Sequence, residues 1–219
     1  MAKQKSLFKC SECGWESAKW VGRCGECQAW STLIEAGRTI GSTKPVNLNT
    51  FAVPITDTQI MEATKIATNI SELDRVLGGG IVPGSVVLLA GEPGIGKSTL
   101  LLEVAAAWAK SIGDSLYISA EESSAQVKLR AERINAIHDR LYLAAETDLS
   151  TILGLIAHHN PKLVIIDSIQ TISSSELEGA AGGVAQVRES AAALISAAKQ
   201  SQTAIVLVGH VTKEGTIAG

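Results

Sequence analysis

The sequence predicts an α/β fold with a mostly parallel central sheet, preceded by a small four-cysteine module. Between residues 85 and 208, apolar segments of strand length alternate with segments of helical composition. A glycine-rich loop of the form G-x-x-x-x-G-K-[ST] follows the first of these strands, and all four cysteines fall between positions 10 and 27. Because helices of this length connect parallel strands by right-handed crossovers, the pattern favours a parallel sheet covered by helices.

The glycine-rich loop, residues 91–98 (GEPGIGKS), lies between an expected strand over 85–90 and an expected helix over 99–110. Its glycines allow backbone N–H groups to surround an anion without Cβ clashes, and the helix adds the partial positive charge of its N-terminus. We expect Lys97 to reach the β- and γ-phosphates of a nucleoside triphosphate and Ser98 to hold Mg²⁺. A chance glycine-rich turn is the alternative, and the strand and helix around the loop disfavour it. The expected nucleotide-binding residues are Gly91, Glu92, Pro93, Gly94, Ile95, Gly96, Lys97, Ser98 and Thr99.

Further elements continue the same alternation along the chain. The expected strands cover 115–119, 141–143, 162–167 and 204–208, and the expected helices cover 123–134, 148–158 and 183–201. Ligands of parallel sheets bind at the carboxyl ends of the strands, so polar residues at those ends are the first candidates for a site.

The segment before the core has a different character. Residues 36–68 show neither helical nor strand periodicity, and we expect a linker with an edge strand near residues 51–55. Ser71 is expected to be the N-cap of a short helix that ends at the glycines of residues 78–80. The expected domains are a zinc-binding module over 1–35, the linker over 36–68 and an α/β core over 69–219.

The four cysteines form two C-x-x-C pairs separated by ten residues. Thiolates at this spacing can close around Zn²⁺, and the metal would supply most of the folding free energy of so short a segment, roughly 10–16 kcal/mol in comparable peptides. Two disulfides or a redox-active pair are the alternatives; an intracellular chain keeps its thiols reduced, and a redox pair would belong to a βαβ unit. The expected zinc ligands are Cys10, Cys13, Cys24 and Cys27.

Three tryptophans, Trp15, Trp20 and Trp30, lie among the cysteine pairs. They could stack on nucleic-acid bases. We expect them instead to fill the small core of the zinc module, which has little other apolar surface to bury.

Polar residues follow several of the expected strands. Asp167 closes the apolar run LVII and is expected to be the acidic residue of a Walker B strand that reaches Mg²⁺; an ordinary turn aspartate is the alternative. Glu121 and Glu122 follow the strand over 115–119, where a carboxylate could orient and deprotonate an attacking water or could cap the next helix. The residues alone leave that choice open.

His210 ends the strand AIVLVG, and it could sense the γ-phosphate or play a structural part. On the helix over 123–134, Lys128, Arg130 and Arg133 are expected to form a solvated face together with Glu132.

Composition excludes some classes of partner. The formal net charge of −3 argues against a protein that holds nucleic acid by overall charge, although a local basic patch stays open. No segment reaches the ~18 apolar residues of a membrane helix, and the opening MAKQKSLFKC lacks the apolar stretch of a signal peptide. We therefore expect a cytoplasmic protein without a membrane partner.

With these residues in place, the chain resembles the RadA (Sms) family of bacterial DNA repair proteins, which are RecA-like ATPases. The resemblance covers essentially all 219 positions. It rests on the four cysteines and on the segments SELDRVLGGGIVPGSVVLLAGEPGIGKSTLLLE, YISAEES, LVIIDSIQTI and GHVTKEGTIAG, in that order. It implies a RecA-like P-loop NTPase core behind a zinc ribbon, with ATP (or dATP), Mg²⁺ and Zn²⁺ as ligands.

The resemblance also implies a role for each candidate residue. Glu121 aligns with the catalytic glutamate of RecA-like proteins, and Asp167 is the Walker B acid that joins Ser98 at Mg²⁺. His210 takes the place of the polar switch that links the γ-phosphate to the DNA-binding loop. The residues expected to be catalytic are Glu121, Lys97, Asp167 and His210.

Members of this family are implied to form hexameric rings when full length and to hydrolyse ATP under stimulation by DNA. They move branched recombination intermediates, so the implied partners are single-stranded and branched DNA and a recombinase of the RecA type. Residues 173–187 and 211–219 match the loops through which RecA-like proteins thread single-stranded DNA, and Lys213 and Arg188 are the nearest candidates for phosphate contacts.

The family continues past Gly219 with further core strands, a Lys-Asn-Arg-Phe-Gly segment and a Lon-protease-like domain. We therefore expect this chain to be truncated and its core to be incomplete at the C-terminus.

Two other function classes fit the same motifs. A small-molecule P-loop kinase shares the phosphate loop and the Walker B acid, and a zinc-ribbon adaptor could use nucleotide as a switch. Stimulation of ATP turnover by single-stranded DNA separates the DNA motor from the kinase, and the need for Glu121 separates it from the adaptor.

Overall fold

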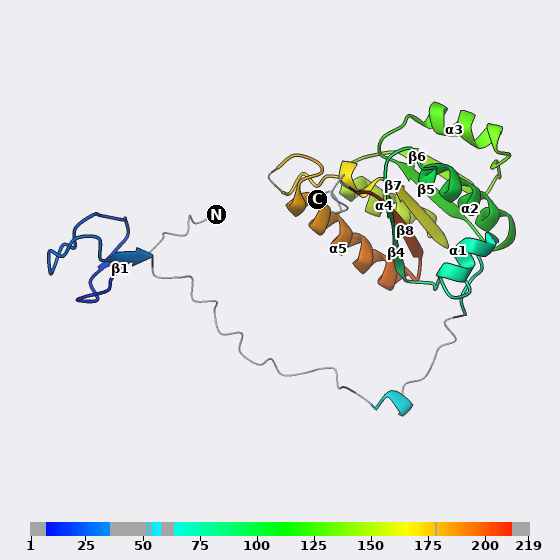
Figure 1. Cartoon of the computed structure of the whole chain (residues 1–219). Helices are drawn as coiled ribbons and strands as arrows, with labels where there is room; N and C mark the ends of the chain where they lie inside the picture. Colours follow the sequence, from blue (N-terminus) through cyan, green and yellow to red (C-terminus); the bar gives the residue numbers. More distant parts are fainter. Residues whose placement is uncertain (1–7, 36–51, 53, 58–63, 178, 212–219) are drawn as a thin grey trace. The chain divides into compact units, whose positions relative to one another are not determined.

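The computed structural model describes residues 8–35, 52, 54–57, 64–177 and 179–211. The chain divides into two compact units, Met1–Thr58 and Gln59–Gly219 (Figure 1).

The first unit contains a small antiparallel sheet. Its strands are β1 (Phe8–Cys10), β2 (Glu16–Ser17) and β3 (Leu33–Glu35), in the order β2-β1-β3. Among the described residues of this unit, Cys10, Cys24 and Leu33 form the buried core, with Phe8 and Trp15 packed against them. A core of this size supplies little hydrophobic stabilisation, as the sequence led us to expect.

The tryptophan prediction is correct for one residue and wrong for two. Trp15 packs against the core, whereas Trp20 and Trp30 are 61% and 72% exposed. The physical reason is that two cysteines already occupy the centre of this unit, so the larger rings stay outside. The Arg23 guanidinium lies 5.6 Å from the centroid of the Trp30 ring and covers part of it.

The second unit is built on a five-stranded sheet in which every neighbouring pair is parallel. The strands are β4 (Val86–Gly91), β5 (Ser115–Ser119), β6 (Leu141–Ala145), β7 (Leu163–Asp167) and β8 (Ala204–His210). Their order across the sheet is β4-β8-β7-β5-β6. The predicted α/β fold with a mostly parallel sheet is confirmed, and all the carboxyl ends lie at one edge.

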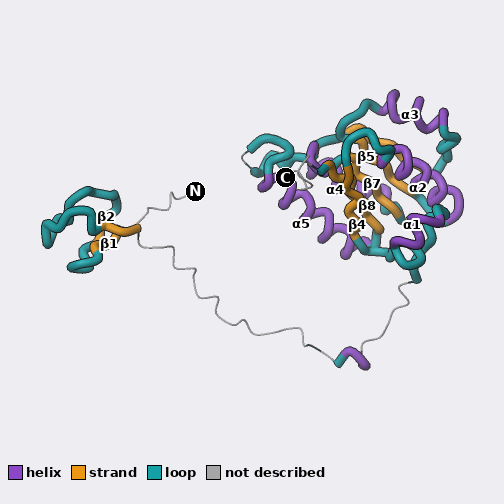
Figure 2. The backbone as a smooth tube through the Cα atoms, viewed as in Figure 1, coloured by secondary structure: helices purple, strands orange, loops and turns teal. Residues whose placement is uncertain are grey.

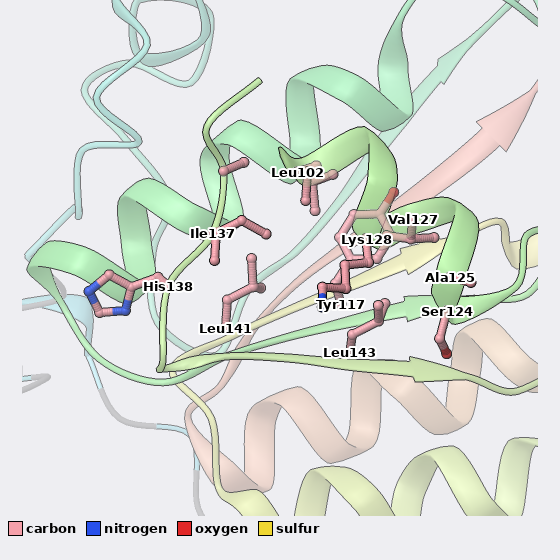
Figure 3. Close-up of a pocket in the computed structure, with 12 residues that line it drawn as sticks. Leu102, Tyr117, Ser124, Ala125, Val127, Lys128, Ile137, His138, Leu141 and Leu143 are labelled. Atoms are coloured by element: carbon pink, nitrogen blue, oxygen red, sulfur yellow. The ribbon is translucent and has the colours of Figure 1, made fainter. Parts of the chain in front are cut away.

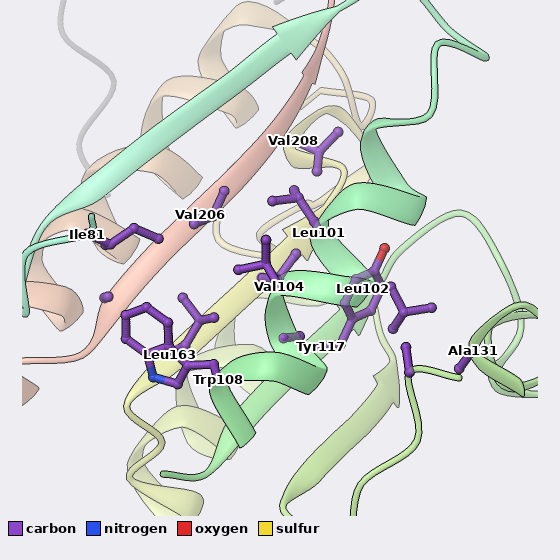
Figure 4. Close-up of a cluster of buried hydrophobic side chains, with 14 of the residues drawn as sticks. Ile81, Leu101, Leu102, Val104, Trp108, Tyr117, Ala131, Leu163, Val206 and Val208 are labelled. Carbon is purple, nitrogen blue, oxygen red and sulfur yellow. The ribbon is translucent and has the colours of Figure 1, made fainter. Parts of the chain in front are cut away.

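Helices connect these strands in sequence (Figure 2). The helices are α1 (Ser71–Val76), α2 (Lys97–Ser111), α3 (Ser124–Arg133), α4 (Leu149–His159) and α5 (Val184–Ser201), with a 3₁₀ turn η2 (Ile169–Thr171) after β7. Alternate strand residues pack on opposite faces of the sheet. Tyr117 and Ile165 join the cluster under α2 and α3 (Figure 4), and Leu116 and Ile166 join the cluster under α4 and α5.

Two local predictions before the core are wrong. Ser71 is the first residue of α1 and not its N-cap, because Ile70 takes that position without a side-chain cap. The entry to α1 is instead fixed by the Asp74 carboxylate, which accepts hydrogen bonds from the Thr68 N–H at 2.7 Å and the Thr68 hydroxyl at 2.8 Å.

The second wrong prediction is the edge strand near residues 51–55. Ile55–Asp57 forms a 3₁₀ turn, η1, with Pro54 directly before it. Proline has no N–H to donate to a ladder, which disfavours a strand there. Phe51 and Val53 lie outside the described residues.

Candidate functional site

The carboxyl ends of β4, β5 and β8 meet around a cavity of about 600 Å³. Residues from the glycine-rich loop, from the segment after β5, from α3 and from the end of β8 line it. The lining consists of Pro93, Gly94, Gly96, Lys97, Ser98, Thr99, Glu121, Glu122, Gln126, Leu129, Arg130, Arg133 and His210. The structure thus brings together most of the residues that the sequence singled out.

The glycine-rich loop has the backbone geometry that its sequence requires. Gly94 and Gly96 have φ angles of 81° and 94°, in the left-handed region that favours glycine. Gly96 is also the N-cap of α2, and it provides no side-chain acceptor for the first N–H groups of that helix. These N–H groups can therefore serve an anion bound in the loop.

Lys97 is buried beside this loop, with 7% of its surface exposed. Its Nζ donates hydrogen bonds to the carbonyl oxygens of Gly91 at 2.9 Å and Glu92 at 2.7 Å. The same amine lies 3.5 Å from Nδ1 of His210, at the end of β8. A positive charge is thus fixed at the mouth of the loop, where phosphate oxygens would bind.

Asp167 ends β7 and is nearly buried, with 6% of its surface exposed. The Tyr117 hydroxyl donates a hydrogen bond of 2.6 Å to its Oδ2. Burial and the negative charge of Asp167 raise the pKa of Tyr117 above its ordinary value, so this hydroxyl stays a donor. Ser98 is the second residue of α2, directly after Lys97. A serine hydroxyl with a carboxylate is an oxygen donor set that suits Mg²⁺.

Glu121 does not cap α3. The N-cap is Ser123, which forms a capping box with Gln126. Glu121 Oε1 instead accepts a hydrogen bond of 2.5 Å from the Ser168 hydroxyl, and it lies 3.1 Å from Nε2 of His210. The helix-capping alternative for Glu121 is therefore wrong, and the carboxylate belongs to the cavity.

One tautomer of His210 satisfies both of its contacts. The Lys97 ammonium can only donate, so Nδ1 serves as the acceptor of that pair. In this tautomer Nε2–H donates a hydrogen bond to Oε1 of Glu121. His210 consequently connects the phosphate loop to the carboxylate of Glu121.

Sequence reasoning missed a second set of residues in the cavity. Arg130 was expected on a solvated face, but its side chain is only 15% exposed and pairs with Glu122 at 2.5 Å. Lys128 and Glu132 do form the exposed pair, 3.9 Å apart. The helical spacing of Gln126, Arg130 and Arg133 is the signal that could have placed them on one face, toward the loop.

The candidates for DNA contact are placed only in part. Lys213 and the rest of residues 212–219 lie outside the described residues, and Arg188 is exposed on α5. The side chain of the buried Gln186 holds the loop before α5 by hydrogen bonds to its backbone. Its Oε1 accepts from the Ser174 N–H at 2.8 Å, and its Nε2 donates to the Leu177 carbonyl at 3.0 Å.

Another cavity, of about 360 Å³, opens between α2, α3 and β6 (Figure 3). Its lining is mainly apolar, including Leu102, Val127, Leu141 and Leu143. It contains no residue of the glycine-rich loop and no carboxylate. We therefore assign the phosphate chemistry to the polar cavity.

The four cysteines of the first unit converge on one point. Their Sγ atoms all lie within 4.8 Å of one another, with Cys10 and Cys27 3.7 Å apart and Cys13 and Cys24 3.5 Å apart. A tetrahedral zinc site with Zn–S bonds of about 2.3 Å places its sulfurs about 3.8 Å apart, so the group fits Zn²⁺.

The four thiols are not bonded to one another. All four cysteines are free, and the S···S distances exceed the ~2.05 Å of a disulfide bond. A hydrogen bond with the Thr32 side chain lowers the pKa of Cys10 to about 6, whereas burial and the neighbouring thiols raise the pKa of Cys27. Zinc binding is therefore indicated by the convergence of the four sulfurs.

Two family models match this chain. A model described as AAA domain matches residues 54–216, and a model described as Rubredoxin metal binding domain matches residues 8–35. The part of the chain that the structure describes contains no helix long and apolar enough to cross a membrane.

Curated relatives match over the whole chain. It is 53% identical to the DNA repair protein RadA of Mycobacterium tuberculosis (strain CDC 1551 / Oshkosh), with 100% of this chain and 47% of the relative covered. It is 47% identical to the protein of the same name from Pseudomonas aeruginosa and 46% identical to that from Bacillus subtilis (strain 168), with 49% of each relative covered. The chain thus spans about half the length of the curated relatives it matches.

Proposed function

Because the chain belongs to the AAA domain family and corresponds to the N-terminal half of bacterial RadA proteins, we propose that it is an ATPase of DNA repair whose turnover is stimulated by single-stranded DNA. The observation that carries the proposal is the contact of His210 with both Lys97 and Glu121. This contact joins the phosphate loop, the candidate catalytic carboxylate and the strand that leads to residues 212–219.

Binding of the triphosphate follows from the loop and from Lys97. The N–H groups at the start of α2 and the Lys97 ammonium supply donors and positive charge to the β- and γ-phosphates. ATP or dATP would fit these donors equally, because they contact phosphate and not ribose. Lys97 exchanges its hydrogen bonds to the Gly91 and Glu92 carbonyls for bonds to phosphate oxygens.

The Ser98 hydroxyl and the Asp167 carboxylate would hold Mg²⁺ at this site. When bound, the ion neutralises negative charge on the phosphates during transfer. Asp167 is fixed for this task by its burial at the end of β7 and by the Tyr117 hydroxyl.

Glu121 would act as the general base for the attacking water. The hydrogen bonds from Ser168 and His210 converge on Oε1, so they fix the direction of the carboxylate. Oε2 can then accept the proton of a water positioned in line with the γ-phosphate. A base held in this way is oriented before the nucleotide arrives.

The same residues would connect nucleotide state to DNA. When Lys97 turns to the γ-phosphate, its contact with His210 Nδ1 weakens, and the end of β8 can move. We propose that residues 211–219 and 173–187 contact single-stranded DNA in a ring of six subunits. The ring would use ATP hydrolysis to drive branch migration of recombination intermediates, together with a recombinase of the RecA type.

Measurement of ATP hydrolysis by the purified chain, with and without single-stranded DNA, tests the proposal. We expect turnover that requires Mg²⁺, rises with DNA and is lost in Lys97→Ala. Lys128→Ala is the matched control, because this lysine is exposed on α3 and forms an ion pair with Glu132.

The rival functions predict different results in the same assay. Turnover that needs an added metabolite and ignores DNA would indicate a small-molecule kinase. Nucleotide binding without turnover, unchanged by DNA and by Glu121→Gln, would indicate an adaptor that uses nucleotide as a switch.

A further inference from the structure

Tyr117 occupies an unusual position for a polar side chain. It lies in the middle of β5, between β6 and β7, and none of its surface is exposed. Figure 4 shows its ring beside Leu102 in the cluster under α2. A phenylalanine would fill the same space, so packing alone does not explain the hydroxyl.

The hydroxyl lies between the two elements that would hold Mg²⁺. It donates to Asp167 Oδ2 at 2.6 Å and lies 3.4 Å from the carbonyl oxygen of Ser98. β5 and β7 are adjacent, with Tyr117 opposite Ile165 and Ser119 opposite Asp167. The sheet register therefore fixes the distance between the phenol and the carboxylate.

Asp167 depends on this hydrogen bond. Among the described residues, Tyr117 provides the only hydrogen bond to the Asp167 carboxylate oxygens. A buried carboxylate that accepts no hydrogen bond is free to rotate about its side-chain torsions. The hydrogen bond to Oδ2 fixes the rotation of the carboxylate and leaves its other oxygen, Oδ1, for another partner.

We propose that Tyr117 is a positioning residue for the metal site, which sets the affinity for Mg²⁺ by orienting Asp167. This inference rests on the proposed nucleotide site. Partners that orient a metal ligand typically change metal affinity by 10- to 100-fold when removed.

The test compares nucleotide affinity in Mg²⁺ with nucleotide affinity in EDTA, using a fluorescent non-hydrolysable ATP analogue. The dissociation constant in EDTA divided by that in Mg²⁺ measures how strongly the metal and the nucleotide are coupled. In Tyr117→Phe we expect this ratio to fall about tenfold, toward one, while the dissociation constant in EDTA stays unchanged. Asp167→Asn sets the lower limit of the ratio.

Tyr142→Phe is the matched control, since Tyr142 is the other tyrosine of the chain and packs against the His159 ring. We expect it to leave the ratio at the wild-type value. An equal ratio in wild type and Tyr117→Phe would overturn the inference while leaving the proposed function intact. A ratio of one in the wild-type chain would instead overturn the metal site itself.

A second measurement covers the case in which Tyr117→Phe does not fold. The chain labelled with 3-fluorotyrosine gives one ¹⁹F resonance for each of its two tyrosines. Adding Mg²⁺ to the nucleotide complex should shift the Tyr117 resonance and leave the Tyr142 resonance in place. If neither resonance moves, Tyr117 does not act on the metal site.

Discussion

Single side chains in the cavity are held by neighbours that come from distant parts of the sequence. Glu121 accepts a hydrogen bond from Ser168, in the turn after β7, and contacts Nε2 of His210, at the end of β8. Two donors on one oxygen make the carboxylate a fixed acceptor, whereas a helix-capping acid would bond to nearby N–H groups. The geometry therefore supports a chemical role for Glu121 more than a structural one.

Replacing Glu121 with Gln tests that role. The amide keeps the size of the side chain but cannot take a proton, so ATP turnover should fall by roughly 10²- to 10⁴-fold while ATP binding is retained. Steady-state hydrolysis and equilibrium binding of a fluorescent ATP analogue measure the two effects. Glu132→Gln is the control, because Glu132 lies outside the cavity lining and forms an exposed ion pair with Lys128. Equal losses in both variants would remove Glu121 from the catalytic role.

At this scale the sequence predicts the residues of the motif and misses those that support them. Lys97, Glu121 and His210 were predicted from loop spacing and strand ends, and the structure brings all three together. The places of Arg130 and Ser168 in the cavity were not predicted. Arg130 contacts Glu122, 8 positions away in sequence, and Ser168 contacts Glu121, 47 positions away. Such contacts follow from the packing of strands and helices, which no local pattern encodes.

At the scale of elements, the four-cysteine unit is expected to depend on its metal. We expect about one zinc per purified chain, and removal of the metal should unfold residues 8–35 because their apolar core is so small. Metal analysis gives the stoichiometry, and tryptophan fluorescence reports unfolding from Trp15. Trp108, buried in the second unit, should keep its environment. A chain that contains no zinc yet folds normally would contradict this prediction.

Helix α4 offers a pH-dependent test of capping. Asp148 is its N-cap, and hydrogen bonds from the Ser150 hydroxyl and from Thr151 lower the pKa of its carboxyl. A lowered pKa means that Asp148 stabilises the fold above the ordinary carboxyl pKa of about 3.9 and loses this effect as pH falls through its own lower value. Asp148→Ala should therefore lower Tm at pH 7, and the difference from wild type should shrink below about pH 4.

Thermal melts of wild type and variant across pH 3–7 check this expectation. Asp139→Ala is the control, because Asp139 lies in an exposed turn outside any helix. A Tm difference that stays constant down to pH 3 would show that Asp148 acts through something other than its charge.

Element boundaries in the core agree with the sequence more closely than those before it. Capping residues mark the start of α3 and α4, and Ser123 and Asp148 stand at those positions. The start of α1 was misplaced by one residue because its stabilising contact, from Thr68 to Asp74, comes from outside the helix. A short helix with no buried residue has little periodicity by which to locate its start.

At the scale of the whole sheet, the sequence predicts parallel strands but not their order. Alternation of strands and helices is a local pattern. The order β4-β8-β7-β5-β6 instead depends on pairing between distant segments, and β4 and β8 are more than a hundred residues apart in sequence. β8, the last described strand in the chain, lies between β4 and β7. This insertion brings His210 to Lys97 and Glu121.

The place of β8 also makes it the spacer of the site. β4 carries the phosphate loop and β7 carries Asp167, and both pair with β8 and not with each other. The glycine-rich loop and Asp167 are therefore separated by one intervening strand. The backbone hydrogen bonds on both sides of β8 set that separation. A proline in the middle of β8 cannot donate to these ladders, so it should displace the loop from Asp167 without touching either.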